Sequence, residues 1–66
     1  MKFLQIYEDA AFCSINYESI EAVVLDQAIP EIKVICKKYS YIEKCDTAES
    51  ARERYANILS QLKGGR

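Results

Sequence analysis

The best candidates for reactive or metal-binding side chains in this chain are three cysteines, Cys13, Cys36 and Cys45. None belongs to a Cys-x-x-C pair, and the sequence contains no histidine. A structural zinc site needs four ligands, so these thiols are expected to be buried or half-buried free cysteines, and we predict no metal and no other cofactor. The commonest general base is missing, and Cys13 near Lys2 or Lys44 could act as a nucleophile only if its thiolate were stabilised, for which the sequence offers no activating base. We therefore predict that the protein is not an enzyme.

A second candidate for function is a group of lysines in the second half of the chain. Residues 1–31 have a net charge of −5 and residues 32–66 a net charge of +4, within a total of −1. Lysines neutralise phosphates and aromatic rings stack on bases, so lysines interleaved with Tyr39 and Tyr41 could form a nucleic-acid surface. The overall acidity argues against nucleic acid, because domains that bind it are commonly strongly basic. The lysines in question are Lys33, Lys37, Lys38 and Lys44.

The C-terminal segment has the pattern of one amphipathic helix over residues 47–62. Asp46 or Thr47 can serve as the N-cap, and Asp46 with Glu49 has the spacing of a capping box. Small or apolar residues that recur at steps of three and four fall in one arc of about 100°, typical of a helix lying on a core. Two glycines then offer a stop signal, so residues 63–66 are expected to form a short disordered tail. The arc consists of Ala48, Ala51, Tyr55, Ile58, Leu59 and Leu62.

The segments before the helix are rich in β-branched and aromatic residues and are separated by turn residues. Residues 16–19 are expected to form a turn or a single helical turn, and Pro30 ends the third strand because proline cannot donate to a central ladder. Strands followed by one helix predict an α+β fold: a small antiparallel sheet of three to five strands, with the C-terminal helix packed on one face. The predicted strands cover residues 2–7, 11–15, 20–26, 31–37 and 39–45.

Length and composition restrict the class of protein. Sixty-six residues, half of them apolar, predict a single folded domain over residues 1–66 with a small core. No run approaches the roughly 18 apolar residues of a membrane span. The N-terminus turns acidic too early for a signal peptide. We expect a cytoplasmic protein with no membrane association.

Apolar residues occupy both faces of the predicted strands. In the third strand, Ile20, Ala22 and Val24 are expected on one face, and Val23 and Leu25 on the other. One helix can cover only one face of a sheet, so the helix-free face would expose an apolar patch, which usually marks an interaction surface. We therefore predict a homo-oligomer joined through the helix-free face or an edge strand. Aromatic residues are favoured at interface centres, and the candidate contacts are Val23, Ile35, Tyr39 and Tyr41.

Two segments resemble small uncharacterised bacterial and phage-borne proteins that combine a β-sheet with a C-terminal helix. In those proteins an I-N-x-x-x-I turn feeds a hairpin, and a D-[ST]-x-E-x-A segment opens the closing helix. The corresponding segments here are Ile15-Asn16-Tyr17-Glu18-Ser19-Ile20 and Asp46-Thr47-Ala48-Glu49-Ser50-Ala51. The resemblance covers residues 12–62 and implies the sheet-plus-helix fold without a defined activity. It also implies the role that phage-encoded proteins of this size often have, which is to bind a host protein or a host defence complex.

The sequence thus predicts a small non-catalytic protein-interaction module that self-associates and has a possible heterologous protein partner. Two alternatives remain open. One is a nucleic-acid-binding module that uses the lysine- and tyrosine-rich strands, which a salt-dependent shift with nucleic acid would favour. The other is a thiol-based enzyme or sensor, which selective alkylation of one cysteine near neutral pH would favour.

Overall fold

Five strands, one short 3-10 turn and one C-terminal helix make up the computed structural model, which describes residues 2–64. Every strand pairing is antiparallel, and the strands divide into a two-stranded hairpin, β1-β2, and a three-stranded sheet of order β3-β4-β5. This arrangement confirms the predicted α+β fold with a closing helix. The elements are β1 (Phe3–Glu8), β2 (Ala11–Asn16), η1 (Tyr17–Ser19), β3 (Ile20–Asp26), β4 (Glu31–Cys36), β5 (Ser40–Lys44) and α1 (Ala48–Gly64).

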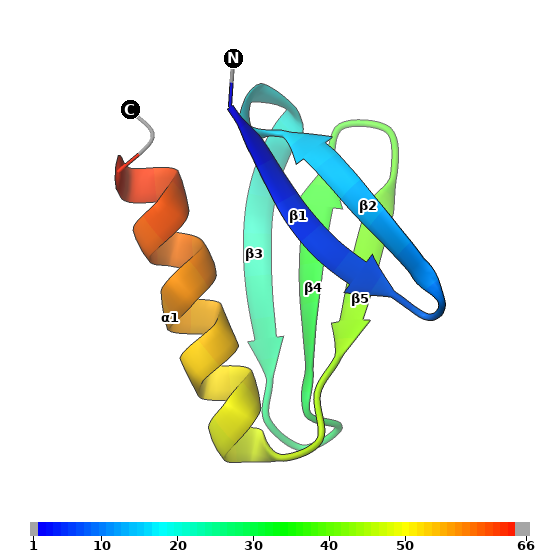
Figure 1. Ribbon diagram of the computed structural model, residues 1–66, viewed down its shortest axis with the longest axis vertical. Coiled ribbons are helices and arrows are strands. Elements are labelled where there is room, and N and C mark those ends of the chain that lie inside the picture. The colour runs from blue at the N-terminus through cyan, green and yellow to red at the C-terminus, as the bar shows by residue number, and fades with distance from the viewer. Residues whose placement is uncertain (1, 65–66) are drawn as a thin grey trace.

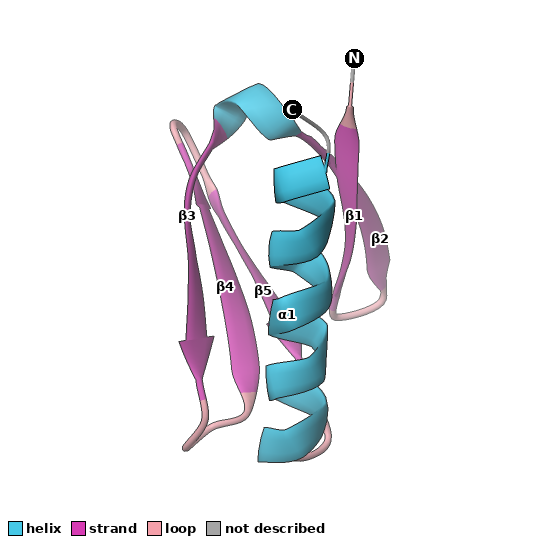
Figure 2. Ribbon diagram, turned by 90° about the vertical axis from the view of Figure 1, so that its left-hand side faces the viewer, coloured by secondary structure: helices cyan, strands magenta, loops and turns pink. Residues whose placement is uncertain are grey.

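The hairpin lies obliquely across one face of the three-stranded sheet, and α1 runs beside β3 at the margin between the two (Figure 1). The view from the side places the three-stranded sheet in one layer, with the helix and the hairpin together on its inner side (Figure 2). Neither the helix nor the hairpin covers the outer face of the three-stranded sheet. The fold therefore encloses one core and leaves the outer face of the three-stranded sheet uncovered.

The core lies where the hairpin, the sheet and the helix meet. Each strand contributes alternate residues to it, as the period of two in a strand requires. The helix contributes residues spaced by about one or two turns, as one face of a helix requires. The buried apolar residues are Leu4, Ile6, Ile15, Ile32, Val34, Ala51 and Ile58.

A tight connection carries the chain from the hairpin to the other sheet. The side chain of Asn16 accepts a hydrogen bond from the backbone N–H of Glu18 at 2.9 Å and caps η1, which confirms the predicted helical turn. The ladder between β3 and β4 is irregular here: Ile20 lies opposite Cys36, but Ala22 lies opposite Ile35. Such a bulge accommodates an extra residue and reverses the alternation of faces. The prediction that Ile20 shares a face with Ala22 is therefore wrong, and Ile20 packs against the core.

Helix α1 begins after Thr47, one of the two predicted caps. Thr47 Oγ1 accepts from the backbone N–H of Ser50 at 3.0 Å, and Ser50 Oγ accepts from the backbone N–H of Thr47 at 3.1 Å. This reciprocal pair is the capping box, so the predicted pairing of Asp46 with Glu49 is wrong. The helix continues to Gly64, beyond the predicted end, and only residues 65–66 of the predicted tail lie outside the described residues.

The inner face of α1 is narrower than the predicted arc. Ala51 and Ile58 are fully buried, and Tyr55 and Leu62 are half-buried against the core. Leu59 is 41% exposed, so its predicted place against the sheet is wrong. One residue beyond a buried position turns about 100° around the helix, which is enough to leave a contact this narrow. No helix within residues 2–64 is long and apolar enough to cross a membrane.

Candidate interaction surfaces

The register of the three-stranded sheet decides which candidate contacts reach the surface. Val23 and Tyr41 both lie opposite Val34, which is fully buried, and residues opposite one another in a ladder share a face. Val23 and Tyr41 therefore point inward and pack against the core. Their predicted place on the helix-free face is wrong, because the alternation in each strand is set by its pairing with β4.

The outer face of the same sheet consists of three cross-strand rows. Ile35 lies between Ala22 and Ser40, and Lys33 lies between Val24 and Ile42. The third row, next to the turn that joins β3 to β4, places Glu31 between Asp26 and Lys44. We call these three rows the open face. Of the predicted contacts, Ile35 belongs to it.

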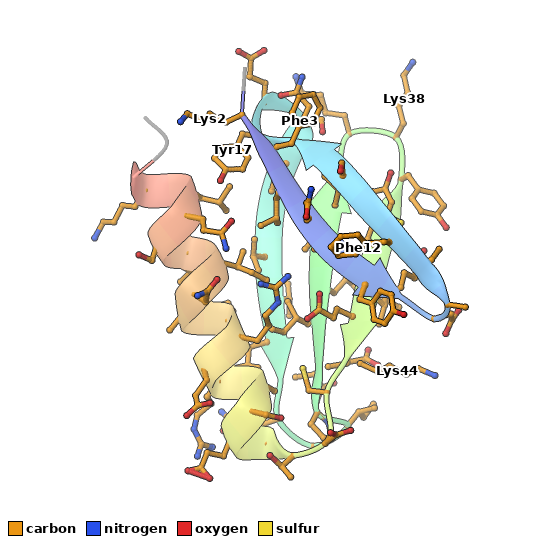
Figure 3. All side chains as sticks on the ribbon, in the orientation of Figure 1. Lys2, Phe3, Phe12, Tyr17, Lys38 and Lys44 are labelled. Atoms are coloured by element: carbon orange, nitrogen blue, oxygen red, sulfur yellow. The ribbon has the colours of Figure 1, made fainter. Side chains whose placement is uncertain are left out.

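The four candidate lysines gather on the open face and at its end. Lys33 is exposed at the centre of the middle row, and Lys44 is exposed in the third row. Lys37 and Lys38 are exposed in the bend between β4 and β5. Figure 3 shows Lys38 extending from that bend and Lys44 extending at the opposite end of β5. The carboxylate of Asp26 is engaged in the β3–β4 turn, where it accepts from the N–H groups of Ala28 and Ile29 at 3.0 and 3.2 Å.

The two candidate tyrosines form a pair at the β4–β5 bend. Their rings meet edge to face with centroids 4.7 Å apart, and Tyr39 is 57% exposed while Tyr41 is half-buried. Partial burial raises the pKa of the Tyr41 hydroxyl above its ordinary value of 10.0, and the nearby thiol of Cys36 acts in the same direction. Tyr39 is therefore the exposed ring beside Lys38, and Tyr41 supports it from the core side.

A second surface lies on the outer side of the hairpin. Phe3, Tyr7 and Phe12 are all exposed there, and the rings of Tyr7 and Phe12 meet edge to face with centroids 5.8 Å apart. Phe3 and Phe12 project from this side of the hairpin (Figure 3). They line a shallow groove with Gln5, Arg54 and Gln61. We call this surface the aromatic hairpin face, and sequence reasoning missed it, although the alternation of aromatic and buried residues in β1 is its signal.

A polar bridge joins β1, β5 and α1 at the margin between the two sheets. Arg54 Nε lies 2.7 Å from Glu43 Oε2, and another nitrogen of the same guanidinium donates to the carbonyl of Gln5 at 2.7 Å. Glu43 Oε1 also accepts from the backbone N–H of Tyr7 at 3.0 Å, and Glu8 Oε2 accepts from the backbone N–H of Ile42 at 3.0 Å. The two carboxylates thus take the place of a backbone ladder between β1 and β5.

The three cysteines are free and half-buried in the structure, which agrees with the prediction of buried or half-buried free thiols. Burial raises the pKa of the Cys45 thiol above its ordinary value of 9.0; Glu43 acts in the same direction, and Arg54 opposes it. A raised pKa is the opposite of what an activated thiolate requires. No group of three or more potential metal-ligating side chains occurs within the described part of the chain.

Comparison with protein-family models, with curated proteins and with solved structures returned no match. The class of this protein therefore rests on its own geometry. It is a small α+β protein with an enclosed core, an open sheet face with Lys33 at its centre, and an aromatic hairpin face.

Proposed function

We propose that this protein is a non-catalytic protein-interaction module that self-associates and presents its open face to a protein partner. The observation that carries this proposal is the middle row of the open face, where Lys33 stands between Val24 and Ile42 with neither helix nor hairpin above it. In an antiparallel sheet with one solvated face, apolar and polar residues normally alternate along each strand, and the polar ones occupy the solvated face. Val24 is 44% exposed on this face, and apolar side chains on an uncovered sheet face are what a partner would bury.

The charges on the open face define the partner that fits it. Lys33 lies at the centre, Lys44 stands in one row with Glu31 and Asp26 toward one end, and Lys37 and Lys38 form the bend at the other. A second copy stacked face to face about an axis through the centre would bring the two Lys33 ammonium groups together, which like-charge repulsion opposes. A partner with an acidic group flanked by apolar residues would complement the middle row, where Lys33 stands between Val24 and Ile42. Binding a host protein or a host defence complex is the role that the resemblance to small phage-borne proteins implies for the chain.

Matched charge reversals test the open face. Immobilised parent protein, Lys33→Glu and Lys63→Glu would be used to capture proteins from the native host, and the purified partner would then be titrated by calorimetry. Lys63 is also exposed but lies in the last turn of α1, away from the open face. We expect Lys63→Glu to bind as the parent does and Lys33→Glu to lose at least tenfold in affinity, about 1.4 kcal/mol. Equal affinity of all three proteins would refute the assignment of the open face.

One observation favours nucleic acid as a second candidate partner. The four lysines named above are all exposed along one side of the molecule, with the Tyr39 ring beside Lys38. Single-strand binding sites combine such a basic track with stacking rings. Tyr41, however, packs inward and leaves one exposed ring instead of two. Fluorescence anisotropy with a labelled single-stranded oligonucleotide at increasing salt tests this alternative, and binding that weakens with salt and is lost in Lys33→Glu would establish it.

A further inference from the structure

Four strand edges in this fold have no backbone ladder: the outer edges of β1 and β2 in the hairpin, and those of β3 and β5 in the three-stranded sheet. They differ in what else occupies them. On β1, the carbonyl of Gln5 and the N–H of Tyr7 point away from β2 and bond to Arg54 and Glu43. On β5, the N–H of Ile42 bonds to Glu8. The free edge of β3 lies beside α1 (Figure 1). Three of the four edges are therefore occupied by side chains or by the helix.

On the fourth edge, the outer edge of β2, residues 12–14 have no such protection among the described residues. Backbone groups in an antiparallel pair alternate between facing the partner and facing away, and residues opposite one another share the same state. Gln5 and Tyr7 face away, so their ladder partners Ser14 and Phe12 also direct their N–H and C=O groups away, onto the free edge. β2 has β1 as its only ladder partner within residues 2–64.

The sequence of β2 offers none of the features that usually block an edge strand. Its six residues, Ala-Phe-Cys-Ser-Ile-Asn, include no charge and no proline, and its pairing with β1 has no bulge. Exposed edges without such features are templates for pairing with another strand. We propose that a second copy of this chain pairs with this edge, so that two antiparallel β2 strands join the hairpins into a continuous four-stranded sheet, β1-β2-β2-β1. This inference rests on the proposed self-association and specifies its contact.

The N–H and C=O groups on the free edge of β2 favour one register for the pairing of the two β2 strands. With Cys13 opposite Cys13 of the second copy, Phe12 of each chain pairs with Ser14 of the other, and four hydrogen bonds form from groups that face the free edge. A register centred on Ser14 would instead pair Phe12 with Asn16, whose carbonyl already accepts from Ser19 Oγ at 2.8 Å. Both registers keep outward residues opposite outward residues, as a continuous sheet requires, so the occupied carbonyl of Asn16 is what favours the register centred on Cys13.

Pairing in this register would explain the exposure of Phe12, whose side chain is the most exposed large apolar one among residues 2–64. Phe12 is 68% exposed, and in the paired sheet the two Phe12 rings become diagonal neighbours on the aromatic hairpin face. Diagonal neighbours lie about 7–8 Å apart at their Cα atoms, within reach of aromatic side chains. The acidic hairpin tips, Glu8-Asp9, point in opposite directions in an antiparallel pair and lie at opposite ends of the joined sheet. The contact is thus self-complementary in shape and free of like-charge repulsion at its centre.

Substitutions at Ser14 test the edge directly. Ser14→Pro removes an N–H that faces the free edge, where proline is tolerated, and Ser14→Ala keeps that N–H. Light scattering across micromolar concentrations should give twice the chain mass for the parent and for Ser14→Ala, and a monomer of 7.6 kDa for Ser14→Pro with unchanged circular dichroism. A folded, dimeric Ser14→Pro variant would overturn the edge contact and leave self-association standing. A monomeric parent would overturn both, and neither result depends on binding to the open face.

Cross-linking keeps the proposal falsifiable if Ser14→Pro fails to fold. A variant with Cys36→Ser and Cys45→Ser retains Cys13 alone, and copper phenanthroline would accept the two electrons released when two thiols lose their protons and form one disulfide. Opposed Cys13 residues should cross-link to a covalent dimer in most of the protein at a concentration where the parent is dimeric. A matched variant that retains Cys45 alone should stay monomeric on a non-reducing gel. Equal cross-linking of the two variants would contradict the register.

Discussion

Arg54 and Glu43 form the only ion pair within the described part of the chain, with Nε and Oε2 2.7 Å apart. The guanidinium makes two contacts with Glu43 and one with the carbonyl of Gln5, so a single helix side chain holds β5 and β1 together. Both side chains are largely shielded from water, with exposed fractions of 26% and 13%. Contacts of this kind are stronger than an exposed ion pair because solvent competes less for the charges.

We predict that Arg54→Ala lowers the free energy of unfolding by about 1.5–3 kcal/mol, since charged hydrogen bonds are lost and Glu43 stays partly shielded without its partner. Arg52→Ala is the matched control, because Arg52 is exposed and makes one side-chain contact, with Gln27 at 2.9 Å. It should change stability by less than about 0.5 kcal/mol. Urea denaturation measures both values, and equal effects would show that the bridge contributes nothing beyond an ordinary surface contact.

A comparison of Ile58→Ala with Leu59→Ala tests the packing of α1. Ile58 is fully buried, so its truncation should cost about 2–5 kcal/mol through lost burial and a residual cavity. Leu59 is 41% exposed, and its truncation should cost distinctly less than that of Ile58. Thermal and urea unfolding of the two variants give the order. If Leu59→Ala lowered the free energy of unfolding more than Ile58→Ala does, Leu59 and not Ile58 would face the core, which contradicts the packing described above.

The N-terminus of α1 depends on Thr47, whose hydroxyl caps the helix through Ser50. Thr47→Ala should reduce the free energy of unfolding by about 0.5–2 kcal/mol. Asp46→Ala is the control, since no contact of the Asp46 side chain contributes to the capping box. Urea midpoints of the two variants provide the measurement. Equal losses would mean that both side chains serve as caps.

Alkaline stability should reveal the environment of Tyr41. Its pKa is raised in the folded state, so the folded protein holds this proton more tightly than the unfolded chain does. The resulting stabilisation is complete below the unfolded pKa of about 10 and is lost as the pH rises through the folded pKa. The stability difference between the parent and Tyr41→Phe should therefore be constant at neutral pH and shift against the parent above about pH 10. A difference that stays constant through this range would refute the raised pKa.

Local sequence patterns were sufficient to locate the five strands, the turn at η1 and the helix. Alternation in segments such as Phe3–Glu8 and a capping threonine before a run of period 3.6 are properties of short stretches of chain. Ile35 lies on the open face, and the four candidate lysines are exposed on that face and in the β4–β5 bend. The roles proposed for them depend on partners and remain predictions.

Contacts between distant segments decided the rest. Val23 and Tyr41 turned inward because both pair with Val34, and the bulge near Glu21 brought Ile20 to the core side. The strands split into two sheets because η1 redirects the chain, and the side chains of Glu8 and Glu43, not a ladder, join β5 to β1. Strand period and helix period determine which residues can share a face. Only pairing across the fold determines which face is enclosed, because that choice is made by residues far apart in the sequence.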